Sequence, residues 1–293
     1  MLDMKTFAVI GAGTMGRGIA YAAALGGYRT ILEDVMPEKL EQGLAWIRQS
    51  FDEGVQRGKV EPAACDAALK RIETARSVQD ASREADFLIE AVPEEMELKL
   101  EIFTLFDKFA KPNAILASNT SSLSIAEMAA MTYRPELCVG MHFFNPVPKM
   151  RLIEMVRAPK TSDETVATCR EVGRRMGKEV VVVKESPGFV TSRVNALIGN
   201  EAFAMLEAGI ASAEDIDKAL KLGLNHPMGP FELVDLVGLD VRLSILEYLQ
   251  QTLGEKYRPS PLLRKYVAEG RLGRKSGRGV YDYTQPNAAE AKS

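Results

Sequence analysis

Residues 6–25 constrain the fold of this chain more than any other stretch. A short strand of β-branched and apolar residues at 6–10 runs directly into Gly-Ala-Gly-Thr-Met-Gly at 11–16, and a helical run over 19–25 follows. In this order the glycines allow a tight turn, let a pyrophosphate approach the backbone, and let the helix pack close to the strand. The free N–H groups at the helix start then face the phosphates. The segment predicts a Rossmann-type dinucleotide-binding domain, with cofactor contacts at Gly11, Gly13, Thr14, Met15 and Gly16.

The end of the next strand indicates which dinucleotide is bound. The strand at 30–32 ends in Glu33-Asp34, and no Lys or Arg follows until Lys39. A carboxylate at this position accepts hydrogen bonds from the adenine ribose hydroxyls and repels a 2′-phosphate. We therefore expect NAD rather than NADP as the cofactor, with Asp34 on the ribose.

A histidine and a glutamate form a candidate catalytic pair. His142, one of only two histidines, ends the apolar run at 137–141, and the Asn-Pro-Val-Pro that follows must turn. Glu154 lies twelve residues further on, inside a mostly apolar strand, where a carboxylate is costly unless paired. A buried carboxylate beside an imidazole fixes its tautomer and raises its basicity, as a general base requires. Taken singly, each residue is better read as structural, but the other motifs along the chain favour catalysis.

A polar loop follows the strand at 114–117, at the edge of the sheet where ligands bind in open α/β folds. The loop reads Ser-Asn-Thr-Ser-Ser at 118–122. One hydroxyl, of Ser122 or Ser124, is expected to cap a helix, but five polar residues in a row exceed what a cap needs. Lys99, on a helix predicted to open at 93–95, is expected near the same cofactor edge.

The pattern of elements predicts two domains. Residues 1–187 form an α/β domain, a doubly wound and mostly parallel sheet that the strand of His142 completes, with an inserted helical hairpin at 37–57 and 62–71. After the Ser-Pro-Gly break at 186–188, residues 188–293 form an all-helical domain. Its expected helices span 189–208, 213–222, 231–253 and 261–270. A capping box, Thr161 with Glu164, is expected before the helix that ends near Met176, and residues 286–293 are expected to fray.

Composition excludes several classes of function. The chain has 293 residues, is 46% hydrophobic and 26% charged, and carries a net charge of −3. This balance is that of a soluble protein without a nucleic-acid or anionic-membrane partner. No apolar run reaches about 18 residues, and the chain enters its first strand too early for a targeting peptide, so we expect a cytoplasmic protein. The three cysteines lack metal-ligand spacing, so no metal site is expected.

Six segments together resemble the 3-hydroxyacyl-CoA dehydrogenase family, most closely its short single-function 3-hydroxybutyryl-CoA members. They cover nearly the whole chain in order: Gly-Ala-Gly-Thr-Met-Gly (11–16), Ser-Asn-Thr-Ser-Ser-Leu-Ser-Ile (118–125), Met-His-Phe-Phe-Asn-Pro-Val-Pro (141–148), Ser-Pro-Gly-Phe-Val (186–190), Asn-His-Pro-Met-Gly-Pro (225–230) and Gly-Arg-Lys-Ser-Gly-Arg-Gly-Val-Tyr (273–281).

The resemblance implies a role for each matching residue. His142 is the base that takes the proton of the 3-hydroxyl, and Glu154 orients it. Ser121 lies between cofactor and substrate. Further cofactor contacts fall on Glu94, Lys99, Asn145 and Lys275, and an ungapped count places Ser50 and Arg57 of the inserted hairpin at coenzyme A contacts.

The chain departs from the family at one catalytic position. The family has asparagine in Val-x-Asn-Arg, where it is thought to bind the substrate carbonyl, and this chain has Ser192. The serine side chain is shorter than that of asparagine. We therefore expect either a water that bridges Ser192 and the substrate carbonyl or another donor to that carbonyl. Asn195, on the same helix face, is the less favoured substitute. Losing one such donor can cost about 2.7–4 kcal/mol of transition-state stabilisation.

The residues themselves predict an NAD-dependent dehydrogenase. The resemblance narrows the predicted reaction to the reversible oxidation of (S)-3-hydroxyacyl-CoA to 3-oxoacyl-CoA. Two other interpretations stay open. One is a hydroxy-acid dehydrogenase of the L-gulonate type, and the other is an NAD-binding structural or regulatory protein weakened by Ser192. The apolar helices after residue 188 exceed what one buried face needs, which favours a homodimer through the helical domain over a plain core.

Overall fold

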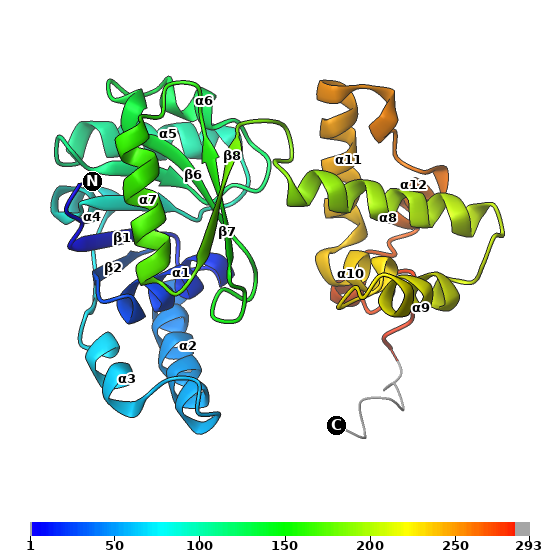
Figure 1. The fold of residues 1–293 in the computed structure, drawn as a ribbon, viewed down its shortest axis with the longest axis horizontal. Helices are drawn as coiled ribbons and strands as arrows, with labels where there is room; N and C mark the ends of the chain where they lie inside the picture. The colour runs from blue at the N-terminus through cyan, green and yellow to red at the C-terminus, as the bar shows by residue number, and fades with distance from the viewer. Residues whose placement is uncertain (1, 285–293) are drawn as a thin grey trace. The chain divides into compact units, whose positions relative to one another are not determined.

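The structure is a computed structural model that describes residues 2–284, so the expectation for residues 286–293 lies outside the described part. The chain divides into two compact units between Phe189 and Val190 (Figure 1). The first unit holds the sheet and the second is helical. This confirms the predicted fold class, a mostly parallel sheet followed by an all-helical region.

The first unit is built on one eight-stranded sheet with the order β3-β2-β1-β4-β5-β6-β7-β8. Neighbouring strands are parallel except β6 and β7, which are antiparallel. The strands are β1 Thr6–Ile10, β2 Arg29–Glu33, β3 Ile72–Thr74, β4 Phe87–Glu90, β5 Ile115–Ser118, β6 Cys138–Phe143, β7 Leu152–Arg157 and β8 Glu179–Lys184. The prediction that the strand of His142 completes the sheet is wrong, because β7 and β8 extend it. The outermost, β8, exposes Val181 and Val182.

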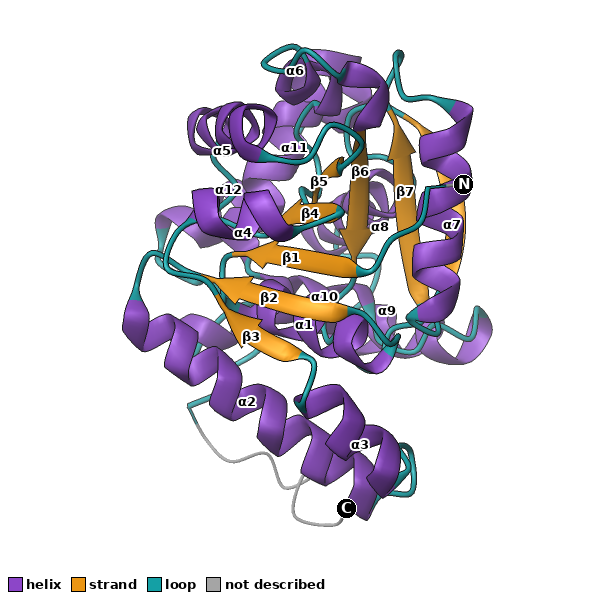
Figure 2. Cartoon of the chain, turned by 90° about the vertical axis from the view of Figure 1, so that its left-hand side faces the viewer, coloured by secondary structure: helices purple, strands orange, loops and turns teal. Residues whose placement is uncertain are grey.

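Helices cover both faces of this sheet (Figure 2). One apolar core joins the sheet to α1, α2, α3 and α7, and a second core on the other face joins it to α4, α5 and α6. The helices are α1 Thr14–Leu25, α2 Pro37–Gln56, α3 Pro62–Leu69, α4 Val78–Glu84, α5 Met96–Phe109, α6 Ile125–Ala129 and α7 Asp163–Arg175, with a 3₁₀ turn at Pro135–Leu137. The inserted hairpin is therefore present as α2 and α3.

Two predicted helix starts are wrong for local reasons. The N-cap of α7 is Ser162, whose hydroxyl accepts from Thr165 N at 3.1 Å. Thr161 is instead buried and donates to the Cys138 carbonyl at 2.7 Å, so it ties the loop to the sheet. Helix α5 begins at Met96, three residues later than expected, and Glu94 before it accepts from Thr120 and Ser121 of the loop after β5.

The second unit has its own apolar core. Its helices are α8 Thr191–Glu207, α9 Ala213–Gly223, α10 Pro230–Val237, α11 Leu239–Leu253 and α12 Pro261–Ala268, with 3₁₀ turns at Glu255–Tyr257 and Arg274–Ser276. The single helix predicted for 231–253 is wrong. Gly238 adopts a φ of 110° and divides it into α10 and α11.

The described residues contain neither a membrane-spanning helix nor a cluster of metal-binding side chains. None of their helices is long and apolar enough to cross a membrane. Within residues 2–284, no group of three or more His, Cys, Asp or Glu side chains is placed to hold a metal ion. The three cysteines are free and buried.

Candidate active site

The glycine loop between β1 and α1 has the geometry that a dinucleotide requires. Gly11 has a φ of 98°, and its N–H donates to the Glu33 carbonyl at the end of β2 at 2.7 Å, which ties the start of the loop to the neighbouring strand. A Cβ on Gly16 would lie 1.7 Å from the Gly11 carbonyl oxygen, so only glycine lets α1 pack this closely. A Cβ on Gly13 would meet nothing within 4 Å. Gly13 is the N-cap of α1 without a side-chain cap, so the first N–H groups of Thr14, Met15 and Gly16 can receive a diphosphate.

Asp34 holds this loop from the end of β2. Its Oδ2 accepts from Ala12 N at 2.8 Å and its Oδ1 accepts from Met36 N at 2.9 Å. Each carboxylate oxygen has a second lone pair for a ribose hydroxyl. Glu33 beside it, to which the sequence assigned no role of its own, is buried. Burial, together with the neighbouring Asp34 charge, raises the pKa of Glu33 to about 7.

His142 and Glu154 face each other across the antiparallel strands β6 and β7. His142 Nδ1 lies 2.9 Å from Glu154 Oε2, and the Glu154 side chain is fully buried. Because a buried carboxylate accepts hydrogen bonds, this geometry assigns the proton to Nδ1 and leaves the lone pair on Nε2. The ring of Phe144 packs against the imidazole at a centroid distance of 4.5 Å, and Phe189 at 5.9 Å. The predicted pairing of these two residues is thus a direct contact.

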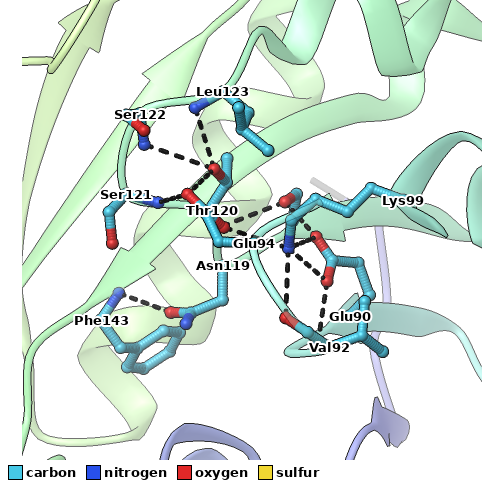
Figure 3. A network of polar contacts seen from close by, with 11 residues as sticks. Glu90, Val92, Glu94, Lys99, Asn119, Thr120, Ser121, Ser122, Leu123 and Phe143 are labelled. Carbon is cyan, nitrogen blue, oxygen red and sulfur yellow. Dashed lines mark hydrogen bonds and ion pairs between the residues drawn. The ribbon is translucent and has the colours of Figure 1, made fainter. Parts of the chain in front are cut away.

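A buried ion pair lies at the carboxyl ends of β4 and β5 (Figure 3). Lys99 Nζ, on α5, is 2.9 Å from both carboxylate oxygens of Glu90 and 3.4 Å from the Val92 carbonyl. The Ser118 hydroxyl donates to Glu90 Oε1. The side chains of Lys99 and Glu90 are 1% and 0% exposed. Lys99, expected near the cofactor, is held in this buried network.

Glu94 links this ion pair to the polar loop after β5. Its Oε2 lies 3.3 Å from Lys99 Nζ, and its Oε1 accepts from Thr120 Oγ1 at 2.5 Å and from Ser121 N at 2.9 Å. Asn119 Oδ1 accepts from Phe143 N at 2.9 Å, which joins the loop to the strand of His142. The loop carrying Ser121 is therefore fixed from two sides.

One serine that follows the polar loop caps a helix. Ser124, and not Ser122, is the N-cap of α6, where its hydroxyl accepts from Glu127 N at 3.2 Å.

The turn after β6 is held by a lysine that sequence reasoning missed. Lys178 Nζ donates to the carbonyls of Val147 and Met150 at 2.5 and 2.7 Å, and burial lowers its pKa to about 8. Val147 packs on α1, where a Cβ at Gly18 would lie 2.9 Å from it. The turn carrying Asn145 is thereby set against the helix of the glycine loop.

The other predicted residues lie apart from this cluster or in the second unit. Ser50 is half-buried on α2, and Arg57, at the C-cap, is exposed with an ion pair to Glu53 at 3.5 Å. In the second unit, Ser192 lies in the first turn of α8, and Lys275 Nζ donates to Asp240 Oδ2 at 2.7 Å.

Comparisons with known proteins agree over almost the whole chain. The model of the 3-hydroxyacyl-CoA dehydrogenase NAD binding domain matches residues 6–186, and that of the C-terminal domain of 3-hydroxyacyl-CoA dehydrogenase matches residues 188–283. A probable 3-hydroxybutyryl-CoA dehydrogenase of Bacillus subtilis (strain 168) is 46% identical over 285 residues, which cover 97% of this chain and 99% of that protein. A 3-hydroxybutyryl-CoA dehydrogenase of Bradyrhizobium diazoefficiens is 45% identical over 96% of each chain.

A solved structure gives the same result. The (S)-3-hydroxybutyryl-CoA dehydrogenase PaaH1 from Ralstonia eutropha superposes with a TM-score of 0.93 at 43% identity, covering 97% of this chain and 100% of that one. The predicted resemblance, the enzyme class and NAD as cofactor are confirmed. The chain belongs to the 3-hydroxyacyl-CoA dehydrogenase family, as an NAD-dependent enzyme that has both the NAD-binding and the C-terminal domain of that family.

Proposed function

We propose that the preferred substrate is a short-chain (S)-3-hydroxyacyl-CoA, with 3-hydroxybutyryl-CoA as the expected example, oxidised reversibly to the 3-oxoacyl-CoA. The observation that carries the oxidation of a hydroxyl group is the buried contact of 2.9 Å between His142 Nδ1 and Glu154 Oε2. The names of the compared 3-hydroxybutyryl-CoA dehydrogenases support the choice of substrate.

The proposed chemistry follows from the tautomer that Glu154 selects. The Nδ1 proton is held by Glu154, so Nε2 of His142 takes the proton of the substrate 3-hydroxyl. NAD held at the glycine loop would supply the nicotinamide ring that accepts the C3 hydrogen as a hydride when that O–H bond breaks. The charge of the resulting imidazolium is stabilised by the Glu154 carboxylate. In the reverse direction, the imidazolium returns the proton to the 3-oxo group.

The remaining roles are proposed from the family pattern. Ser121 lies between cofactor and substrate, and Ser192 donates to the substrate carbonyl in place of asparagine. The coenzyme A handle lies along the inserted hairpin, at Ser50 and Arg57. Cofactor contacts are proposed for Asp34, Glu94, Asn145 and Lys275.

The direct test is the reduction of acetoacetyl-CoA by the purified protein, followed by loss of NADH absorbance. Turnover with NADH that exceeds turnover with NADPH and with free acetoacetate would support the proposal. Turnover of free hydroxy acids but of no acyl-CoA would favour a hydroxy-acid dehydrogenase instead.

The Ser192→Asn variant, run in parallel, tests the departure from the family. Similar rates in both proteins would mean that the serine serves as the donor. An inactive wild type with an active Ser192→Asn variant would mean that this chain has left the reaction of its relatives.

We also propose a homodimer through the helical unit and a cytoplasmic location. Leu236, Val237 and Val241 on α10 and α11 are 50%, 38% and 41% exposed, which is apolar area that a second copy would cover. Light scattering at working concentration tests the dimer, and a mass of 32.2 kDa would contradict it. Three free, buried thiols fit a reducing compartment, and fractionation of the native host tests the location.

A further inference from the structure

We propose that Lys178 is a positioning residue for the cofactor site. Its ammonium holds the turn at 145–150, and this turn carries Asn145. The inference rests on the proposed function, in which Asn145 contacts NAD. The affinity for the cofactor then depends on a side chain from the loop between α7 and β8, to which neither the sequence nor the proposed chemistry gives a role.

The turn at 145–150 lies mostly at the surface. Four of its residues are exposed, namely Asn145, Pro146, Lys149 and Met150, and within this turn only Val147 is buried. The Pro146 carbonyl accepts from the N–H groups of Lys149 and Met150 at 3.0 Å each. These bonds close the turn on itself but do not attach it to the rest of the unit.

Two contacts attach the turn to its surroundings. Val147 packs on α1, where a Cβ at Gly18 would lie 2.9 Å from it. Lys178 Nζ donates to the carbonyls of Val147 and Met150, at 2.5 and 2.7 Å. The two carbonyls are three residues apart, so one ammonium fixes the turn at two points. An apolar contact alone would leave the turn free to tilt about Val147.

The backbone that carries Lys178 is itself fixed. Its N–H donates to the Gly173 carbonyl of α7 at 2.9 Å. The N–H of the next residue, Glu179, donates at 2.7 Å to the carbonyl of Arg151, which directly precedes β7. The side chain of Lys178 therefore reaches the turn from a base that is joined both to a helix and to the sheet.

The charge of Lys178 is committed to these two carbonyls. No carboxylate in residues 2–284 forms an ion pair with it, and burial lowers its pKa to about 8. Burying a cation costs free energy unless hydrogen bonds compensate for the lost water. The carbonyls of the turn supply that compensation, so the ammonium favours the one position of the turn in which both carbonyls reach it.

The test compares full-length wild type with Lys178→Met, Lys178→Arg, Asn145→Ala and the double variant Asn145→Ala/Lys178→Met. Lys111→Met is the matched control, because Lys111 Nζ also makes a hydrogen bond of 2.7 Å, to Asp86 Oδ1, but at the amino end of β4. The readouts are hydrogen exchange of a peptide covering residues 143–151 and the Kd of NADH by fluorescence. Turnover of acetoacetyl-CoA by the wild type is measured beside them.

Positioning predicts a specific pattern. In Lys178→Met, exchange in 143–151 accelerates about tenfold, and the Kd of NADH rises about tenfold because Asn145 is no longer held in place for its contact. In the Asn145→Ala background, the same change adds little to the Kd, since both substitutions remove one contact. Lys178→Arg keeps the charge and the N–H donors and recovers most of the loss. Lys111→Met leaves both readouts unchanged.

Unchanged turn exchange and unchanged NADH affinity in Lys178→Met would overturn the proposal. An equal factor lost with and without Asn145 would also overturn it, because Lys178 would then act through the stability of the unit. If Lys178→Met does not fold, Lys178→Gln, which is shorter and uncharged, is judged by the same readouts. If the wild type turns over no acyl-CoA, the proposed function fails, while exchange and NADH binding still decide the role of Lys178.

Discussion

Two buried pairs at the carboxyl edge of the sheet look alike but differ in what they leave available. The His142–Glu154 pair uses one ring nitrogen in the contact of 2.9 Å, so the other nitrogen can take part in chemistry. The Lys99 ammonium, by contrast, lies 2.9 Å from both Glu90 oxygens and within 3.4 Å of the Val92 carbonyl and the Glu94 carboxylate, so protein acceptors surround it. The difference teaches that burial and charge do not by themselves mark a catalytic group. What separates the two pairs is whether an atom remains for the substrate.

The strongest test of this comparison is His142→Gln. Glutamine cannot act as a general base near pH 7, so kcat for acetoacetyl-CoA reduction should fall about 10³- to 10⁴-fold. The Kd of NADH, measured by fluorescence, should stay close to that of wild type because the glycine loop is untouched. A kcat close to wild type would refute the assignment of His142 as the base.

The second test concerns stability rather than rate. Lys99→Met leaves Glu90 buried without its cation, and we expect a loss of about 3–5 kcal/mol in the free energy of unfolding. Urea denaturation of the double variant Glu90→Leu/Lys99→Met should recover most of that loss, since no charge is then left unpaired. A single variant as stable as wild type would show that the pair is not buried in solution.

Glu154→Gln should have a smaller effect on rate than loss of the histidine. The amide removes the charge that stabilises the imidazolium and permits the wrong tautomer, so we expect kcat to fall about 10²-fold. Steady-state kinetics with acetoacetyl-CoA would check this. An unchanged kcat would mean that Glu154 is structural.

The smallest expected effect is at Glu33. The pKa of Glu33 in the folded protein is about 7, above the ordinary value of 4.5. Between these two pH values the folded chain therefore keeps a proton that the unfolded chain has released. The stability that Glu33 contributes is therefore complete below about pH 4.5 and is lost as pH rises to 7. Relative to Glu33→Gln, wild type should lose on the order of 1–2 kcal/mol between pH 5 and 8, allowing for solvent screening. Urea denaturation at each pH gives the free energy of unfolding of both proteins. If the two values changed equally with pH, the prediction would be contradicted.

The sequence predicted the parts of the site that follow from local pattern. The glycine loop could be predicted because its motif is contiguous in the sequence. The His142–Glu154 pair could be predicted because each residue is polar in an otherwise apolar strand. The same reasoning applies to Glu90, which ends the buried strand β4 and needs a partner. The sequence therefore contains a signal for the partner of Glu90 as well.

Other features could not be found from pattern. The position of Lys99 Nζ depends on how α5 packs against two strands, which residue spacing does not encode. β3 was missed because it has three residues and little buried surface, so it lacks an apolar pattern. The break at Gly238 was missed because apolar residues flank it on both sides and a glycine within a helical pattern is tolerated.

The edge strand β8 has a consequence for how the protein behaves at high concentration. Its outer side presents unpaired backbone groups beside Val181 and Val182, which are 44% and 36% exposed. A run of valines on a free edge is a template for strand addition and aggregation between unfolding molecules. The charged residues Glu179 and Lys184 close both ends of this run and oppose such stacking. The colloidal behaviour of the protein therefore depends on two surface charges that have no part in its chemistry.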